Sequence, residues 1–214
     1  MNTVAKPKKA TEEKELKMRP IRQARITISI KSLSPLISNA WNEKGLEMMR
    51  MTATERKKRV KTARDPQEEA SSKCYRTESG NAGINAMALK NAIIGAAHKD
   101  MGIEKTLVRK ALFLHCKDKG GIIPIMPQEY EIREDIVRVG ANQTDLRYRP
   151  TWHEWETTVT FTVDRELLSD QDLINLVNRA GFSIGIGEWR PEKDGEFGRF
   201  EVDPTKPVVT EDLN

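Results

Sequence analysis

The segment Gln23–Ser32, QARITISIKS, alternates apolar and polar side chains with a period of two. Ile26, Ile28 and Ile30 therefore fall on one face of an extended chain, and the residues between them fall on the other. This pattern predicts a half-buried strand, with the isoleucine face on a core and the polar face toward solvent. A protein with such a strand needs a sheet and an apolar layer to cover it, which constrains the rest of the fold.

Two helices can supply that layer. Asn85 precedes AMALKNAIIGAAHKD and has the character of an N-cap, and small apolar residues on one face of this helix allow close docking on a sheet. Ser169 likewise caps SDQDLINLVNRAG, whose first turn is acidic, and Gly181 is the predicted stop. Between the helices, ETTVTFTVD is rich in β-branched residues and predicts a second long strand.

The remaining segments complete the predicted order of elements. ALFLHCKD and IIPIMP, separated by Gly120-Gly121, predict a hairpin, and YEIREDIVRVG predicts another strand. TDLRYRPTWHEW is predicted to be a loop, and GRFEV a closing strand. Without insertions the order is βαββαβ, which predicts an α+β fold of the RRM or ferredoxin-like kind, with two helices on one face of an antiparallel sheet.

The predicted division of the chain has three parts. Residues 1–22 are a basic flexible arm, residues 23–203 are one RRM-like domain, and residues 204–214 are a disordered tail. Within the domain, residues 42–83 form a helical or irregular insertion that is rich in Met, Lys and chain-breaking residues.

Charge is distributed unevenly along the chain. Residues 1–64 hold 17 Lys+Arg and 6 Asp+Glu, a net +11; the other 150 residues hold 36 − 17 = 19 and 32 − 6 = 26, a net −7. A basic first third predicts an anionic partner, and nucleic acid is the best candidate. The alternative is a solvated tail that aids solubility alone.

Sequence patterns for cofactors, metals and membranes are missing. Cys74 and Cys116 form no CxxC pair, and the histidines stand in no metal-binding motif. Gly185-Ile186-Gly187 resembles the start of a dinucleotide fingerprint, but the third glycine is absent and Pro191 prevents the helix that should follow. The sequence has no P-loop motif, no apolar run long enough to cross a membrane and no secretory signal. We therefore expect no cofactor, no metal, no membrane partner and a cytoplasmic location.

Arginines and aromatic rings interleave in two places, around residues 147–155 and 189–200. Rings stack on bases without strong sequence preference, while Arg and Lys contact phosphates. The residues predicted to contact nucleic acid are Arg56, Lys57, Lys58, Arg59, Arg147, Arg149, Trp152, His153, Gly185, Gly187, Trp189, Arg190 and Arg199. Gly185 and Gly187 would let backbone N–H groups approach a phosphate. Alternatively, the glycines serve a tight turn and the aromatic residues belong to the core.

Two histidines are the candidates for a catalytic role. His98 and His115 are the candidate general acid and base of a metal-independent ribonuclease. The simpler interpretation places His98 at a helix C-terminus, where a cation is favourable, and His115 at the rim of a strand. No Ser or Cys is recognisably paired with a base.

Two resemblances accompany these patterns. ESGNAGINAMALKNAIIGAAH and GFSIGIGEWRPEKDGEFGRFEV resemble the turn-and-helix and the C-terminal Gly-rich loop of the RAMP superfamily, the RRM-derived proteins of CRISPR systems. Length and insertions fit its Cas7-like members best. SPLISNAW, ARDPQEEA, EDIVRVG and DLRYRPTWHEW, together with the two stretches above, resemble an uncharacterised family from bacteriophages and prophages, over about residues 25–202.

These resemblances imply a phage-encoded protein in a bacterial cytoplasm that binds single-stranded RNA or DNA without cleaving it and assembles as a homo-oligomer along the strand. One alternative is a Cas6-like endoribonuclease that uses His98 or His115. Another is a virion or anti-defence protein that binds only proteins.

Overall fold

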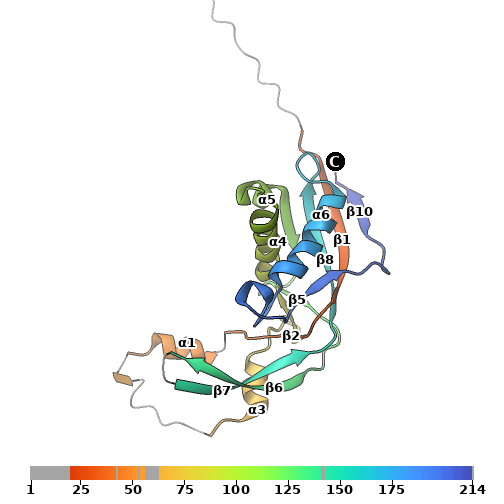
Figure 1. Cartoon of the computed structure of the whole chain (residues 1–214). Helices are drawn as coiled ribbons and strands as arrows, with labels where there is room; N and C mark the ends of the chain where they lie inside the picture. Colours follow the sequence, from red (N-terminus) through yellow and green to blue (C-terminus); the bar gives the residue numbers. More distant parts are fainter. Residues whose placement is uncertain (1–19, 42, 53, 56–62, 141–142, 214) are drawn as a thin grey trace, which may run out of the picture.

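The computed structural model describes residues 20–41, 43–52, 54–55, 63–140 and 143–213. Most of the predicted basic arm lies outside these ranges. The described chain is an α+β protein built around an antiparallel main sheet (Figure 1). Among the described residues, no helix combines the length and the apolar character that a membrane crossing requires.

Strand β1 (Gln23–Ser32) lies inside the main sheet, as its alternating pattern predicted. It pairs along nearly its whole length with β8 (Glu156–Asp164), and β8 pairs on its other edge with β4 (Leu112–His115). The free edge of β1 is shared by β10 (Val209–Asp212) and β9 (Phe200–Val202). Every one of these pairings is antiparallel.

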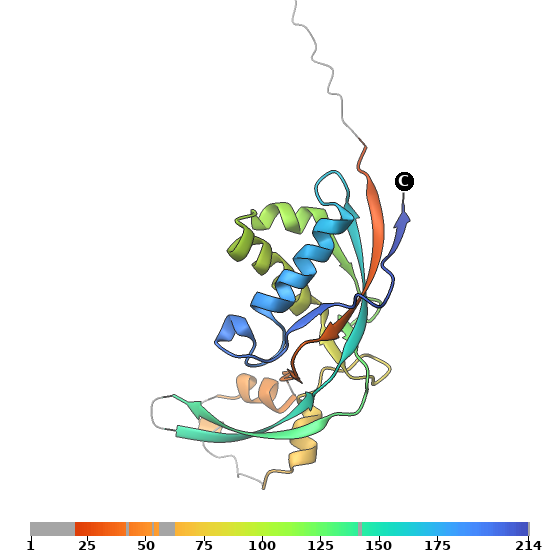
Figure 2. The same cartoon turned by 45° about the vertical axis from the view of Figure 1, so that its right-hand side comes forward.

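One face of this sheet is covered by helices (Figures 1 and 2). These are α4 (Ala86–Met101), α6 (Asp170–Arg179) and the short α5 (Lys105–Ala111). The buried isoleucines of β1 share a core with small and aliphatic residues of α4 and α6. Both predicted caps are confirmed: Asn85 accepts from the N–H groups of Met87 and Ala88, and Ser169 forms a capping box with Asp172.

A second sheet lies beside the first. It contains β2 (Leu36–Ile37), β7 (Gln143–Trp152) and β6 (Glu131–Val139), and β6 and β7 form a long hairpin that extends away from the main sheet (Figure 2). Helix α3 (Pro66–Ser72) packs on this hairpin, and α1 (Glu43–Arg50) precedes it in the chain. A small sheet of β3 (Gly83–Asn85) and β5 (Ile122–Pro124) completes the strands.

Several predicted elements need correction. The expected hairpin around Gly120-Gly121 does not form, because β4 pairs with β8 and β5 pairs with β3. The predicted loop around residues 144–155 is largely strand β7, whose partner is β6. The tail expected to be disordered contains β10, whose backbone hydrogen-bonds to β1 although its side chains are exposed. The insertion contains α1, which agrees with the helical alternative predicted for it, and α3, which lies in a part expected to be irregular.

Helix α6 ends at Arg179 with Ala180 as its C-cap, next to the predicted stop at Gly181, but Gly181 does not end the helical path. The chain continues through a π-helical turn, η1 (Ala180–Ile184), and the end comes at Gly185, whose φ is 70°. Gly181 meets a different need, because a Cβ there would lie 1.8 Å from the carbonyl oxygen of Phe200. Close packing of η1 on β9, rather than helix termination, therefore requires this glycine.

The alternation in β1 predicts the result of paired substitutions. Ile28→Ala should lower the free energy of unfolding by about 2–5 kcal/mol, because the side chain is fully buried between the sheet and the helices. Ser29→Ala, on the opposite face, should change it by about 0.5 kcal/mol or less. Urea denaturation of both variants measures the difference, and equal losses would show that β1 is not covered on one face alone.

Candidate nucleic-acid interface

The Gly-rich loop between η1 and β9 runs against β2 and is fixed there by its backbone. The N–H of Glu188 donates to the carbonyl of Ile37 at 2.9 Å, and the N–H of Gly198 donates to that of Pro35 at 2.7 Å. Within the loop, the N–H of Ile186 donates to the carbonyl of Gly198 at 3.0 Å. A single-turn 3₁₀ helix, η2 (Pro191–Lys193), lies between these contacts. The loop is thus an ordered element that backbone hydrogen bonds hold against the second sheet.

Its glycines are explained by close backbone packing. Gly187 has a φ of 79°, and a Cβ there would lie 2.5 Å from the carbonyl oxygen of Ile37. Gly185 has a φ of 70°, and its N–H donates to the carbonyl of Ala180 at 2.8 Å. The predicted phosphate contact from the Gly185 N–H therefore needs correction, since this group already caps the π-helical turn.

Two aromatic rings of the loop make cation–π contacts with arginines of the hairpin. Trp189 and Phe197 lie 6.0 Å apart between ring centroids. The guanidinium carbon of Arg133, from β6, lies 5.3 Å and 4.9 Å from these two centroids, and that of Arg149, from β7, lies 5.7 Å from the Trp189 centroid. Each cation–π contact contributes on the order of 0.5–2 kcal/mol, more when the pair is desolvated. These contacts hold the base of the hairpin against the loop.

Arg149 and Trp152 are structural, which corrects their predicted role. Both side chains are only 2% exposed, so neither reaches a ligand in solution. Arg149 donates to the Asp135 carboxylate at 3.2 Å, and Asp135 also accepts from Arg133 at 2.8 Å. Trp152 packs edge-on against Tyr130, with 5.5 Å between centroids. The Arg149 Nε, Thr151 Oγ1 and Trp152 Nε1 atoms are buried and have no hydrogen-bond partner among the described residues.

The other predicted binding residues are partly exposed and carry local partners. Arg147 lies 3.4 Å from Asp145, and Arg190 donates to Glu192 at 2.9 Å and to the carbonyl of Gly187 at 3.0 Å. Arg199 stacks on the exposed ring of Phe182 at 5.2 Å. His153 is 63% exposed and lies 3.1 Å from Glu131. Arg56, Lys57, Lys58 and Arg59 lie outside the described residues.

The two candidate catalytic histidines lie on the surface of the main domain. The ring of His98 is 3.4 Å from the carbonyl oxygen of Ile103, and that of His115 contacts the hydroxyl of Thr162. Both partners are uncharged. Within the described ranges, no second ionisable side chain hydrogen-bonds to either ring, and no cluster of His, Cys, Asp and Glu could hold a metal ion.

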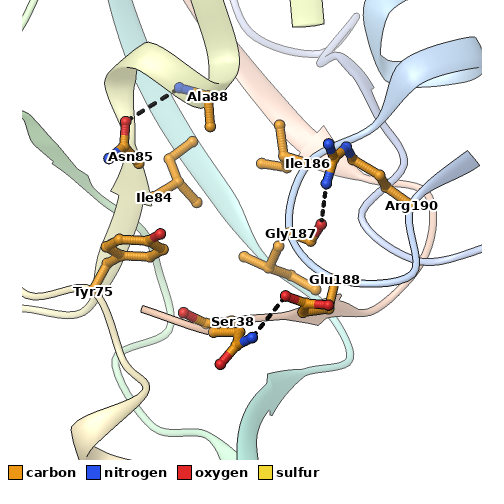
Figure 3. A pocket seen from close by; sticks show the side chains of 12 residues that line it. Ser38, Tyr75, Ile84, Asn85, Ala88, Ile186, Gly187, Glu188 and Arg190 are labelled. Carbon is orange, nitrogen blue, oxygen red and sulfur yellow. Dashed lines mark hydrogen bonds between the residues drawn. The ribbon is translucent and has the colours of Figure 1, made fainter. Parts of the chain in front are cut away.

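A pocket of about 150 Å³ opens where the loop, β2 and the start of α4 meet (Figure 3). Tyr75 and Ile84 line one side, and Ile186 and Arg190 line the other (Figure 3). The amide nitrogen of Asn39 donates to the Glu188 carboxylate at 2.8 Å. Burial, and then the nearby Glu188 charge, raise the pKa of Tyr75, so its phenol remains protonated at neutral pH. The full lining is Leu36, Ser38, Asn39, Tyr75, Gly83, Ile84, Asn85, Ala88, Ile186, Gly187, Glu188 and Arg190.

A lysine beside this pocket lacks a close counter-charge. Lys73 ends α3, and its carbonyl accepts hydrogen bonds from the Ser38 hydroxyl and the Ala40 N–H. Burial lowers the pKa of Lys73 first, and repulsion from Arg147 and Arg149 lowers it further, while attraction to the carboxylates of Glu69 and Glu188 partly opposes the shift. In the part of the chain that the structure describes, no carboxylate lies within 4.0 Å of its ammonium group. An anion placed here would relieve this repulsion.

The sequence patterns did not identify Lys73, Tyr75 or Asn39 as site residues. Lys73 and Tyr75 belong to a segment expected to be irregular, and Asn39 follows a two-residue strand. Trp41 was also missed, although it is 68% exposed only two residues beyond Asn39. The tryptophan that ends SPLISNAW is the signal in the sequence that could have drawn attention to this segment.

No protein-family model matches the chain, and a search of curated proteins finds no significant match.

Matched glycine substitutions should separate backbone strain from close packing in the loop. Gly80→Ala should cost about 1–2 kcal/mol of unfolding free energy, because φ is 88° but a Cβ would meet nothing within 4 Å. Gly187→Ala should cost about 1–3 kcal/mol more, because its Cβ would also press on β2. Thermal or urea denaturation compares the two, and equal losses would contradict close docking of the loop on β2.

Proposed function

We propose that this chain is a non-catalytic protein that binds single-stranded nucleic acid, RNA or DNA. The observation that carries the proposal is Lys73, a partly buried cation that has no carboxylate within 4.0 Å among the described residues and whose backbone is hydrogen-bonded to Ser38 in the wall of a pocket with aromatic and polar groups. A nucleic-acid strand can use both features, since its phosphates attract cations and its bases stack on aromatic rings or enter pockets.

The arrangement of the main sheet supports an RRM-like or ferredoxin-like core for this function. The strand order is β10-β1-β8-β4, with β9 sharing the edge occupied by β10. Helix α4 follows β1 and precedes β4, and α6 lies between β8 and β9 in the chain. Each helix thus links two strands that are separated in the sheet by a third, which is the connection expected of a split βαβ fold. Fold alone does not establish nucleic-acid binding, so the proposal depends on the site.

The phosphate path we propose follows the base of the hairpin. Arg133 and Arg147 are about one-third exposed and occupy the same face of the β6–β7 hairpin as the buried Arg149. Each also has a carboxylate partner, Asp135 or Asp145. Lys73, which lacks one, is therefore the cation most available to a phosphate.

The remaining parts of the proposal are assembly and origin. The insertion, the residue just before it and the hairpin carry exposed apolar side chains, among them Met49, Trp41 and Ile136, which suit contact with another copy of the chain. Assembly along a strand, the relation to the RAMP superfamily and the phage origin stay predictions, as does the contribution of the basic N-terminal region.

Binding should depend on salt and on Lys73. The affinity for a fluorescein-labelled 20-nucleotide strand should fall steeply with salt, because cations that bind phosphates displace counterions. Lys73→Gln should lower the slope of log K against log salt by about 0.7 to 1. Lys110→Gln removes the same charge from α5, away from the pocket, and should leave the slope within error. Fluorescence anisotropy at several salt concentrations measures all three proteins.

Equal slopes for wild type and Lys73→Gln would contradict the role of Lys73. A failure of the wild-type protein to bind any strand at low salt would contradict the proposed function itself. Circular dichroism melting curves of the two variants serve as the folding control, since both substitutions remove one positive charge and keep a flexible polar side chain.

Non-catalytic binding also predicts the outcome of a cleavage assay. Labelled RNA should stay intact after long incubation with concentrated protein in EDTA, because neither His98 nor His115 has an ionisable partner among the described residues. Cleavage that His98→Ala or His115→Ala abolishes would replace the binding proposal with the ribonuclease alternative.

A further inference from the structure

We infer that the pocket between the Gly-rich loop and the start of α4 holds one base of the bound strand and selects guanine. This inference rests on the proposed function and adds a base preference to it. It comes from three properties of the pocket, which are its size, its unused polar groups and its position beside Lys73.

The size and walls of the pocket suit one planar ring. Its volume is about 150 Å³, well below the roughly 300–1,000 Å³ typical of drug-sized ligands. In another protein, an apolar cavity of about 150 Å³ binds benzene. Ile84 and Ile186 provide apolar surface on opposite sides of the opening (Figure 3). A nucleobase that leaves the strand's stack can enter such a space, whereas a whole nucleotide is too large.

The polar groups around the pocket have hydrogen-bonding capacity to spare. Glu188 accepts from Asn39 through one oxygen, and its second oxygen has no hydrogen-bond partner among the described residues. Asn85 uses its side-chain oxygen to cap α4, so its amide NH₂ keeps both donors. The hydroxyl of Tyr75 points into the pocket (Figure 3) and has no hydrogen bond within the described part of the chain. The pocket therefore presents a charged acceptor on one side and neutral donors on the other.

Guanine matches this arrangement better than the other bases. An ionised carboxylate only accepts hydrogen bonds, and charge-assisted bonds are the strong ones. Guanine alone presents two adjacent donors, N1–H and the N2 amino group, on its Watson–Crick edge, next to the O6 acceptor. The two donors suit Glu188, and O6 suits Tyr75 or Asn85. Adenine and cytosine place an acceptor beside their exocyclic amino group, and uracil and thymine have a single donor between two acceptors.

Lys73 lies where it can bind the backbone of the nucleic-acid strand next to the pocket. Its backbone carbonyl accepts from Ser38, a pocket-lining residue, so its position is tied to the pocket wall. A cation beside the pocket can hold a phosphate next to the inserted base without entering the pocket. Charge neutralisation and base selection would then be carried by different residues, as is usual in nucleic-acid recognition.

The test compares strands that differ only in one base type. Fluorescein-labelled 20-nucleotide strands are prepared as DNA and as RNA, with a uniform thymine or uracil background and five separated guanines, adenines or inosines. Wild-type protein should bind the guanine strand about tenfold more tightly than the adenine strand. Inosine lacks the N2 amino group but keeps N1–H and O6, so its affinity should fall between the two.

Two variants address the pocket directly. Glu188→Gln keeps the shape of the side chain but replaces a charged acceptor with an amide, and should reduce the guanine preference to twofold or less. Ala88→Leu places a larger, helix-compatible side chain at an exposed pocket-lining position on α4, and should have the same effect by filling the space. Neither should weaken binding to the adenine strand by more than about threefold, because Lys73 and the arginines remain, and Glu188→Gln should strengthen that binding if it changes it, because it removes a charge that repels phosphates.

The outcomes separate this inference from the proposed function. Equal, salt-dependent affinity of the wild-type protein for guanine and adenine strands overturns the base pocket and leaves strand binding intact. A guanine preference that survives both variants places selection elsewhere and also overturns the inference. The absence of binding to every strand overturns the proposed function, and the pocket inference with it. Melting temperatures within a few degrees of wild type show that the variants are folded.

Discussion

The contact between the Gly-rich loop and β2 joins the two halves of the structure. On one side the loop leads directly into β9, which pairs with β1 in the main sheet. On the other, the N–H of Glu188 and the carbonyl of Ile37 bind the loop to β2, which pairs with β7 in the second sheet. This approach is possible only because Gly187 has no Cβ. Since the pocket is walled by both halves, its shape depends on the backbone contacts between the loop and the β2 segment.

The hairpin is fixed to the same loop by charge rather than by apolar packing alone. Arg149 is buried against Asp135 and the ring of Trp189, so its desolvation is offset by an ion pair and a cation–π contact. Loss of one partner of such a buried pair typically costs about 3–5 kcal/mol, because the remaining charge is left uncompensated. The orientation of the hairpin and the conformation of the loop are therefore coupled. A ligand would meet a largely preformed surface, which reduces the entropy lost on binding.

Local patterns predicted the main sheet and its helices well, while pairings and site residues were harder to predict. The period of two in β1 and the caps Asn85 and Ser169 are local signals, and they led to the correct elements. The partners of β4 and β5 depend on long-range contacts, and a glycine pair between two short strands suggested a hairpin instead. Arg149 and Trp152 appeared suited to nucleic acid, because sequence alone does not show that a carboxylate 14 residues earlier buries the arginine. No sequence pattern pointed to Lys73 or Tyr75, because their positions at the site depend on where α3 ends in the folded chain.

The presence of a carboxylate at a proposed nucleic-acid site needs a physical explanation. Glu188 would repel a phosphate, so a site made only for the backbone should exclude it. Here the cations lie at the hairpin and at Lys73, while Glu188 faces the pocket with its charge shared by Asn39. A carboxylate in that position weakens binding to a strand whose base offers it no donors, and strengthens binding to one whose base offers two. Its repulsion thus contributes to selectivity, because discrimination depends on the difference between the two affinities rather than on either one.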